Sequence, residues 1–132
     1  MSKFNVFRLF GLPLTAVALA ACQSSAPPAP SSASRGALPT MERVALAANA
    51  CWFKSGDAAF KAYRLAPELK SFSGRPRILI VPRNSPESLP LAVVQAEGNP
   101  AQLAAFGPIM TGALGARMSS DIKRWANGAK GC

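Results

Sequence analysis

Residues 76–82 read PRILIVP, the strongest strand pattern in the chain. The apolar and mostly β-branched run between the two prolines favours an extended, buried conformation, and Pro76 and Pro82 set its ends. Turn-forming residues lie on both sides, at 71–74 (SFSG) and 84–88 (NSPES). Because turns this close to a strand return the chain alongside it, we expect an antiparallel hairpin before and after this segment.

The flanking segments supply the partners of this strand. We expect one strand over residues 63–70 before it and another over 91–96 (LAVVQA) after it. A turn at 97–100 (EGNP) then leads to residues 102–106, which can return as a fourth strand. The pattern therefore predicts three or four antiparallel strands joined by short connections.

A helix is predicted upstream of the strands, over residues 40–53. Thr40 is expected as its N-cap, and Glu42 is expected in its first turn, where the helix dipole favours an acid. Ser55 and Gly56 signal its end. Apolar residues recur on one face at three- and four-residue steps: Met41, Val44, Ala45, Ala48, Cys51 and Trp52.

A second, short helix is predicted near the C-terminus, over residues 120–127. Ser119 or Ser120 is expected to cap it, whereas Gly112 and Gly115 are expected in an irregular connection before it. So short a helix depends on tertiary packing. The residues expected to pack it and to close it are Ile122, Trp125 and Gly128.

Helix, antiparallel strands and helix in this order predict an α+β fold with the helices on one face of the sheet. Residues 38–132 are expected to form this single small domain. No internal repeat is visible in the sequence.

The N-terminal residues indicate where the protein is sent. A short basic start precedes an apolar run at 9–19, which is typical of a secretory signal peptide and too short for a spanning helix of about 20 residues. The run ends in Leu19-Ala20-Ala21-Cys22, which resembles the lipobox of bacterial lipoproteins. The resemblance implies that residues 1–21 are removed as a signal peptide and that Cys22 is acylated. The alternative is an ordinary secreted protein with a chance cysteine near the cleavage site.

The same resemblance implies a membrane address. Gln23 and Ser24 follow the cysteine, where an aspartate often retains Gram-negative lipoproteins in the inner membrane, so we expect the periplasmic face of the outer membrane. Residues 22–37 then form a flexible Ser/Ala/Pro tether, with a motif for a proline-binding domain as the alternative. The globular part resembles small uncharacterised envelope lipoproteins of Gram-negative bacteria.

Two cysteines remain once Cys22 is assigned to the lipid. Cys51 and Cys132 are an even number in an exported chain, which favours a disulfide. Such a bond would pin the C-terminal residue and stabilise a small domain. Free thiols or intermolecular pairing are the alternatives.

The composition argues against an enzyme. The chain has no histidine, the usual general base and the commonest metal ligand. The six acidic residues form no recognisable short motif, so we expect no catalytic residues, no metal site and no cofactor. They stand at positions 42, 57, 68, 87, 97 and 121.

Basic residues crowd the predicted first hairpin. Removal of the signal peptide with Lys3 and Arg8 leaves 13 of the 15 basic residues against 6 acidic ones, a formal net charge of +7. Arginine matches phosphate oxygens in pairs, so the cluster can bind lipid phosphate or lipopolysaccharide. A solvated face that protects strand edges is the alternative, and nucleic acid is not expected in this compartment. The cluster consists of Arg64, Lys70, Arg75, Arg77 and Arg83.

Most aromatic side chains are expected in the core, but Phe72 falls in a predicted turn, where an exposed ring can enter a partner or a membrane interface. The sequence therefore predicts a non-enzymatic, membrane-anchored envelope lipoprotein that acts as a structural or protein-interaction component. Binding of anionic envelope ligands through the basic hairpin is the alternative.

Overall fold

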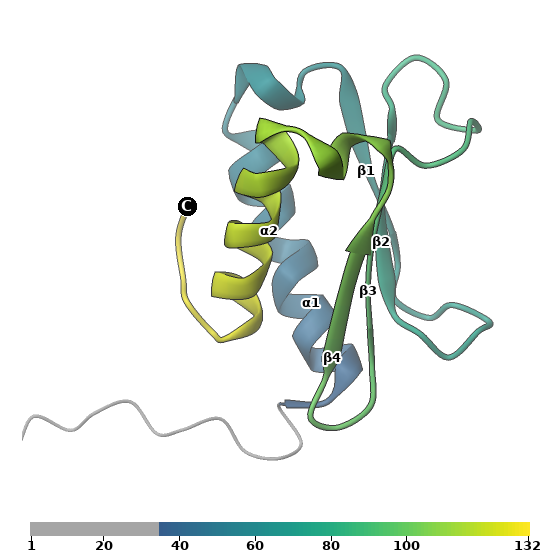
Figure 1. Ribbon diagram of the computed structural model, residues 1–132, viewed down its shortest axis with the longest axis vertical. Helices are drawn as coiled ribbons and strands as arrows, with labels where there is room; N and C mark the ends of the chain where they lie inside the picture. Colours follow the sequence, from purple (N-terminus) through teal and green to yellow (C-terminus); the bar gives the residue numbers. More distant parts are fainter. Residues whose placement is uncertain (1–34) are drawn as a thin grey trace, which may run out of the picture.

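Four antiparallel strands form one sheet, and they lie in the sheet in the order in which they follow along the chain (Figure 1). The computed structural model describes residues 35–132. The predicted signal peptide, Cys22 and most of the predicted tether lie outside these residues. The strands are β1 (Tyr63–Glu68), β2 (Arg77–Pro82), β3 (Ala92–Glu97) and β4 (Gln102–Phe106).

The predicted α+β fold is confirmed, with β2 pairing on both sides. Ile80 lies opposite Leu65 of β1 and opposite Ala92 of β3, so both expected hairpins form. The turn before β2 closes with the Gly74 amide donating to the Ser71 carbonyl at 3.0 Å, and Gly74 has a φ of 71°, which explains the glycine.

Helical segments cover one face of this sheet (Figure 1). α1 and α2 pack against each other, and α1 packs on β2 and β3. α1 continues without a break into η2, a π-helical segment that ends where Ser55 and Gly56 were expected to stop it. The helical segments are α1 (Ala37–Ala48), η2 (Asn49–Lys54), η3 (Ala58–Phe60), η4 (Pro108–Thr111) and α2 (Ala113–Ala126).

The predicted start of the first helix is wrong by three residues. The N-cap is Gly36 rather than Thr40, and no acidic residue stands in the first turn. The Ala37 amide donates to the carbonyl of Gly98 in the β3–β4 turn at 3.0 Å, so a tertiary contact starts the helix earlier. The Ala101 amide also donates to the Arg35 carbonyl at 2.8 Å, so the end of the predicted tether, from residue 35, contacts the folded domain.

The C-terminal helix is longer than predicted, because it begins at Ala113 instead of residue 120. Gly112 is its N-cap, and Gly115 lies inside its first turns rather than in an irregular connection. A Cβ atom at Gly115 would stand 2.2 Å from the carbonyl oxygen of Met110, so the glycine lets the helix pack tightly on η4. A low intrinsic helix propensity at this position is therefore outweighed by packing.

The close contact at Gly115 makes Gly115→Ala a sharp test of this packing. Helix propensity alone predicts a gain of about 1 kcal/mol from the substitution, whereas overpacking against backbone predicts a loss of about 1–3 kcal/mol. We expect the loss, measured by urea denaturation. Gly112→Ala is the control, because a Cβ atom there meets nothing within 4 Å. Stabilisation by Gly115→Ala would contradict the contact.

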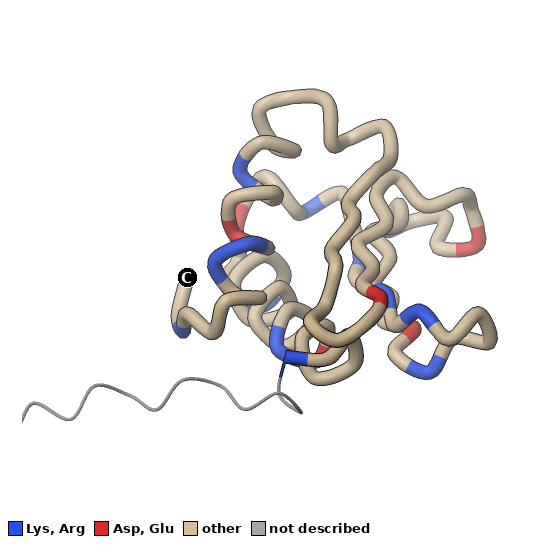
Figure 2. The backbone as a smooth tube through the Cα atoms, turned by 60° about the horizontal axis from the view of Figure 1, so that its bottom comes forward, with Lys and Arg blue, Asp and Glu red and all other residues tan. Residues whose placement is uncertain are grey.

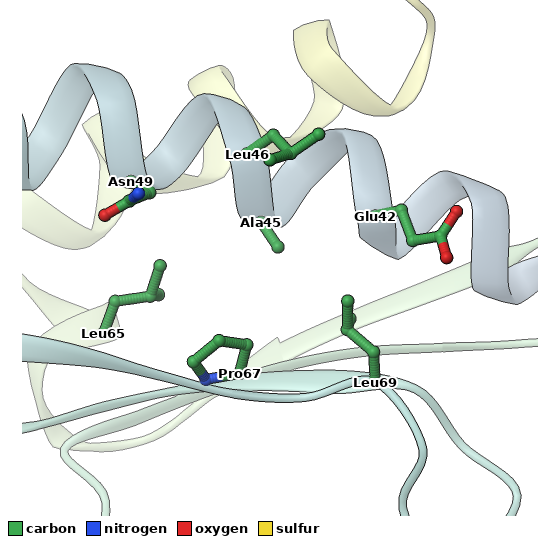
Figure 3. Close-up of a pocket in the computed structure, with 7 residues that line it drawn as sticks. All are labelled: Glu42, Ala45, Leu46, Asn49, Leu65, Pro67 and Leu69. Carbon is green, nitrogen blue, oxygen red and sulfur yellow. The ribbon is translucent and has the colours of Figure 1, made fainter.

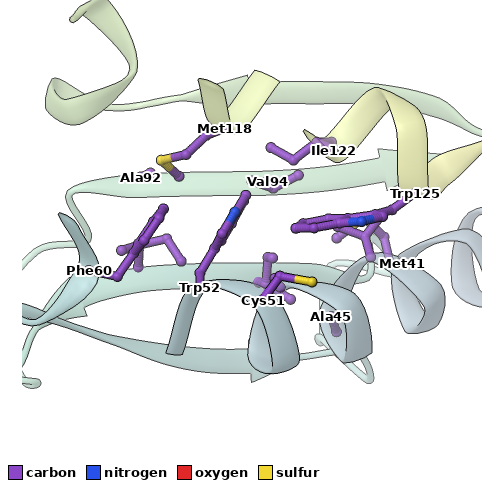
Figure 4. Packing of buried hydrophobic residues seen from close by; sticks show 14 of the residues in the cluster. Met41, Ala45, Cys51, Trp52, Phe60, Ala92, Val94, Met118, Ile122 and Trp125 are labelled. Atoms are coloured by element: carbon purple, nitrogen blue, oxygen red, sulfur yellow. The ribbon is translucent and has the colours of Figure 1, made fainter. Parts of the chain in front are cut away.

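The core lies between the sheet and the helices (Figure 4). Trp52 is completely buried; its ring stacks on Phe60 at 5.0 Å between centroids and lies 5.1 Å from the ring of Trp125. The sheet contributes Ile78, Ile80 and Val94, all fully buried. The apolar face expected for the first helix is confirmed, as is burial of Ile122 and Trp125.

The expected disulfide between Cys51 and Cys132 is formed. It ties the C-terminal residue to η2, and the tail also receives hydrogen bonds from Arg124 and from the Trp125 indole, whose Nε1 donates to the Gly131 carbonyl at 3.0 Å. Gly128, with a φ of 92°, closes α2 as expected. Within residues 35–132, no helix has the length and apolarity needed to cross a bilayer.

Candidate functional site

An open apolar groove runs between α1 and the edge strand β1 (Figure 3). It has a cavity volume of about 490 Å³. Figure 3 shows Leu65, Pro67 and Leu69 rising from the strand side toward the helix, from which Ala45 points back at them, whereas the Leu46 side chain projects away from the strand. The groove exists because α1 packs on β2 and β3 and has α2 on its other side, so that β1, which η2 contacts, is only partly covered. We call it the α1–β1 groove.

Five of the seven residues that line the α1–β1 groove are aliphatic. Leu46 is 73% exposed, an unusual state for a leucine in the middle of a helix that packs on a sheet. Glu42 and Asn49 supply the polar groups, one turn to either side of the leucine (Figure 3). Such a surface can bind apolar side chains, and two polar groups can orient them.

The edge of the sheet beside this groove is protected against strand addition. Pro67 lies in β1, opposite Ile78 of β2, and has no N–H to offer to an added strand. A partner at this edge would therefore bind through side chains in the groove rather than by extending the sheet.

The sequence pattern did not point to the α1–β1 groove. Its one usable signal was Leu46, an apolar residue that stands off the apolar face of the helix. The sequence predicts only a strand for Leu65, Pro67 and Leu69. Whether the side chains on the inner face of that strand are exposed depends on where the helices lie. Only the tertiary arrangement brings the residues of the groove together.

Three of the five residues in the predicted basic cluster are engaged with other groups. Arg77 pairs with Glu68 across β1 and β2, with 2.6 Å between Nε and Oε2. Arg75 pairs with Glu97 of β3 at 2.7 Å, so a second acid opposes the cluster. The Nε of Arg83 donates to the Lys61 carbonyl at 2.6 Å.

The other two members of the cluster, Arg64 and Lys70, are exposed and make no side-chain hydrogen bond or ion pair to any residue in the range 35–132. Blue segments on the tube in Figure 2 mark the basic residues gathered at the loop that joins β1 and β2. The cluster therefore combines free cations with arginines already paired to carboxylates. Its capacity to attract an anion depends mainly on Arg64 and Lys70.

Two of the scattered acids meet at the base of α2. Arg117 donates to Asp57 at 2.6 Å and lies 3.9 Å from Asp121, which also accepts a hydrogen bond from the Trp52 indole at 2.9 Å. The bond from Arg117, with help from the Ala59 amide, holds the pKa of Asp57 below its ordinary value, and the same bond raises the pKa of Arg117. Each carboxylate has a cationic partner, so the arrangement ties η3 and η2 to α2.

The Glu68 carboxylate forms an ion pair with the Arg77 guanidinium and not a pair with a second carboxylate, the arrangement that acid–base catalysis would use. Among the described residues, no three histidine, cysteine or acidic side chains gather where they could hold a metal ion. The α1–β1 groove is thus the concave site with the clearest chemical character in this part of the chain. No protein-family model, curated protein or solved structure matches the chain.

Proposed function

We propose that this protein is a non-enzymatic interaction component of the bacterial envelope, held to the membrane by a lipid on Cys22, and that it binds a partner protein through the α1–β1 groove. The exposed Leu46 in an aliphatic groove carries the proposal. Burying such a side chain contributes about 1.5–3 kcal/mol, which is the scale of an interface anchor.

The shape of the groove favours an amphipathic helix as the bound element. The lining residues of α1 and the first residue of η2 stand at positions i, i+3, i+4 and i+7, so the groove follows about two helical turns. A helix lying beside α1 would extend the helical layer over β1, at the usual spacing of 8–10 Å between packed helices. Pro67 opposes the alternative of an added strand. A partner helix with apolar residues at i and i+4 therefore fits the site.

The disulfide supports the proposed compartment to a limited degree, since such bonds persist in oxidising surroundings. It also gives a small domain the rigidity that a preformed binding surface needs. The acylation of Cys22 is proposed from its lipobox resemblance alone.

Site-specific photo-crosslinking in intact cells tests the groove. A photoreactive residue at position 46 should form an adduct with one envelope protein, and the Leu65→Arg substitution should abolish it. Once that partner is purified, Leu46→Ala should weaken its binding about tenfold, as loss of an interface anchor does. Leu38→Ala is the matched control, because Leu38 is a half-exposed leucine of the same helix outside the groove. Equal effects of the two substitutions would exclude the groove as the binding site.

The second candidate function is binding of an anionic envelope ligand through the basic hairpin. The exposed and unpartnered Arg64 and Lys70 favour it. Binding of this kind weakens as salt is added, whereas binding in the aliphatic groove does not.

A further inference from the structure

The sheet has a second face, turned away from the helices. Strand residues alternate between faces, so the side chains opposite the core-facing Ile78, Ile80 and Val94 belong to it. One cross-strand row on this side is apolar throughout, with Ala66, Leu79, Val93 and Phe106 in register. We call this side the outer sheet face.

Two loops project on the side of the outer sheet face (Figure 1). One joins β1 to β2 at residues 69–76, and the other joins β2 to β3 at residues 83–91. Each carries a large apolar side chain in solvent: Phe72 is 111% exposed and Leu89 is 88% exposed. They are the two most exposed large hydrophobic side chains of residues 35–132, and they stand at opposite ends of the strands they flank.

Hydrogen bonds within the loop hold the backbone around Phe72. The turn closes from the Gly74 amide to the Ser71 carbonyl, and the Ser71 hydroxyl also bonds the Arg75 carbonyl and the Ser73 hydroxyl. Leu89 follows a similar turn, in which the Ser88 amide donates to the Ser85 carbonyl at 3.0 Å. Because these bonds hold the backbone, the apolar side chains point outward without collapsing onto the domain.

Cations flank the apolar tip at Phe72, whereas the loop of Leu89 carries Arg83 and Glu87. Lys70 stands two residues before Phe72 in the sequence, and Arg75 stands three residues after it. Arg64 lies on β1 opposite Val81, on the outer side of the sheet. Acidic residues on the strands and loops of this side are fewer than the basic ones: Glu68, Glu87 and Glu97 stand against Arg64, Lys70, Arg75, Arg77 and Arg83.

We infer that the outer sheet face docks on an anionic lipid bilayer, with Phe72 and Leu89 inserted at the boundary between headgroups and acyl chains. Exposed aromatic and aliphatic tips suit such an interface, and cations beside the aromatic tip strengthen its attraction to an anionic surface. Each cation near the surface contributes by attraction to lipid phosphate. The inference rests on the proposed membrane anchorage, which keeps the domain beside a bilayer, but it is independent of the protein partner. Docked in this way, the domain keeps its helical layer turned away from the lipid.

Tryptophan fluorescence tests the docking in the full chain, purified from its native membrane and reconstituted into vesicles of phosphatidylcholine and phosphatidylglycerol. The native Trp52 and Trp125 are buried and supply a constant background. In the Phe72→Trp variant, the new ring should emit at shorter wavelength and lose at least half of its signal to brominated lipid. Leu46→Trp is the matched control, because Leu46 is a highly exposed apolar residue on the helical side. Its signal should not respond to the lipid.

Three results would overturn the docking: no quenching of the Phe72→Trp variant, equal quenching of both variants, or quenching of neither until a partner protein is added. The last would assign this face to a protein. Neutralising Lys70 and Arg64 with glutamine should lower the quenching in phosphatidylglycerol vesicles several-fold and leave it unchanged in pure phosphatidylcholine.

The intact mass of the same sample separates this inference from the anchorage. A mass without acyl chains, together with quenching by added phosphatidylglycerol vesicles, would refute the anchorage and keep the docking. A lipidated protein without quenching would refute the docking and keep the anchorage.

Discussion

Trp52→Ala is expected to destabilise the protein by about 4 kcal/mol, within the 3–5 kcal/mol range for deletion of a buried aromatic side chain. The indole is completely buried and touches two other rings of the core, Phe60 and Trp125. Its Nε1 also donates to Asp121. The free energy of unfolding of a small domain is about 5–15 kcal/mol, so this loss removes a large share of the total stability. The urea midpoint of the variant measures it.

Phe72→Ala is the matched control for this substitution, because it also removes an aromatic ring but from full exposure. We expect its free energy of unfolding, measured by urea denaturation, to stay within about 0.5 kcal/mol of that of the native protein. The Trp52→Phe variant separates packing from hydrogen bonding: it keeps most of the ring contacts, and Asp121 retains its bond from Arg124 at 3.0 Å. Equal losses from Trp52→Ala and Phe72→Ala would contradict the arrangement of the core.

Removal of the disulfide is expected to have an effect of the same size. The bond joins residues 81 positions apart in the sequence. The chain-entropy model assigns about 4–5 kcal/mol to a closed loop of that length, although measured losses are commonly about 2–4 kcal/mol. The double variant Cys51→Ala/Cys132→Ala should lower the urea midpoint accordingly and leave no unpaired thiol.

Reduction of the native protein is the internal control for the double variant. Both samples lack the same bond, so their urea midpoints should agree after a small correction. The correction accounts for the sulfur atom lost at Cys51, a buried residue that is only 6% exposed. The hydrogen bonds from Arg124 to the carbonyls of Gly131 and Cys132 act on the same tail and should keep part of it in place. A native midpoint in the double variant would show that the bond contributes nothing to stability.

Local signals in the sequence were sufficient for most of the fold. The β-branched run between Pro76 and Pro82 predicted β2, and the glycine at 74 predicted the turn before it, because these preferences act within a few residues. The helical apolar period placed Cys51 and Trp52 on the buried face for the same reason. The pairing of Cys51 with Cys132 followed from the cysteine count, given the prediction that the chain is exported.

Helix ends were predicted less well, since their causes are distant in sequence. α1 starts at Ala37 because its amide meets the β3–β4 turn, and α2 starts at Ala113 because Gly115 packs on Met110. Glycine lowers helix propensity, so the local signal pointed away from the observed structure.

The sequence by itself determined the order of the elements, the faces of the strands and the exposed turn at Phe72. Tertiary structure alone decided the α1–β1 groove and the state of the basic cluster. Leu46, Leu65 and Leu69 become a surface only because the helical layer leaves part of β1 uncovered. Arg75 and Arg77 meet Glu97 and Glu68 only because the strands pair in one register. Burial and ion pairing depend on what lies opposite a side chain in space, which local sequence preference does not encode.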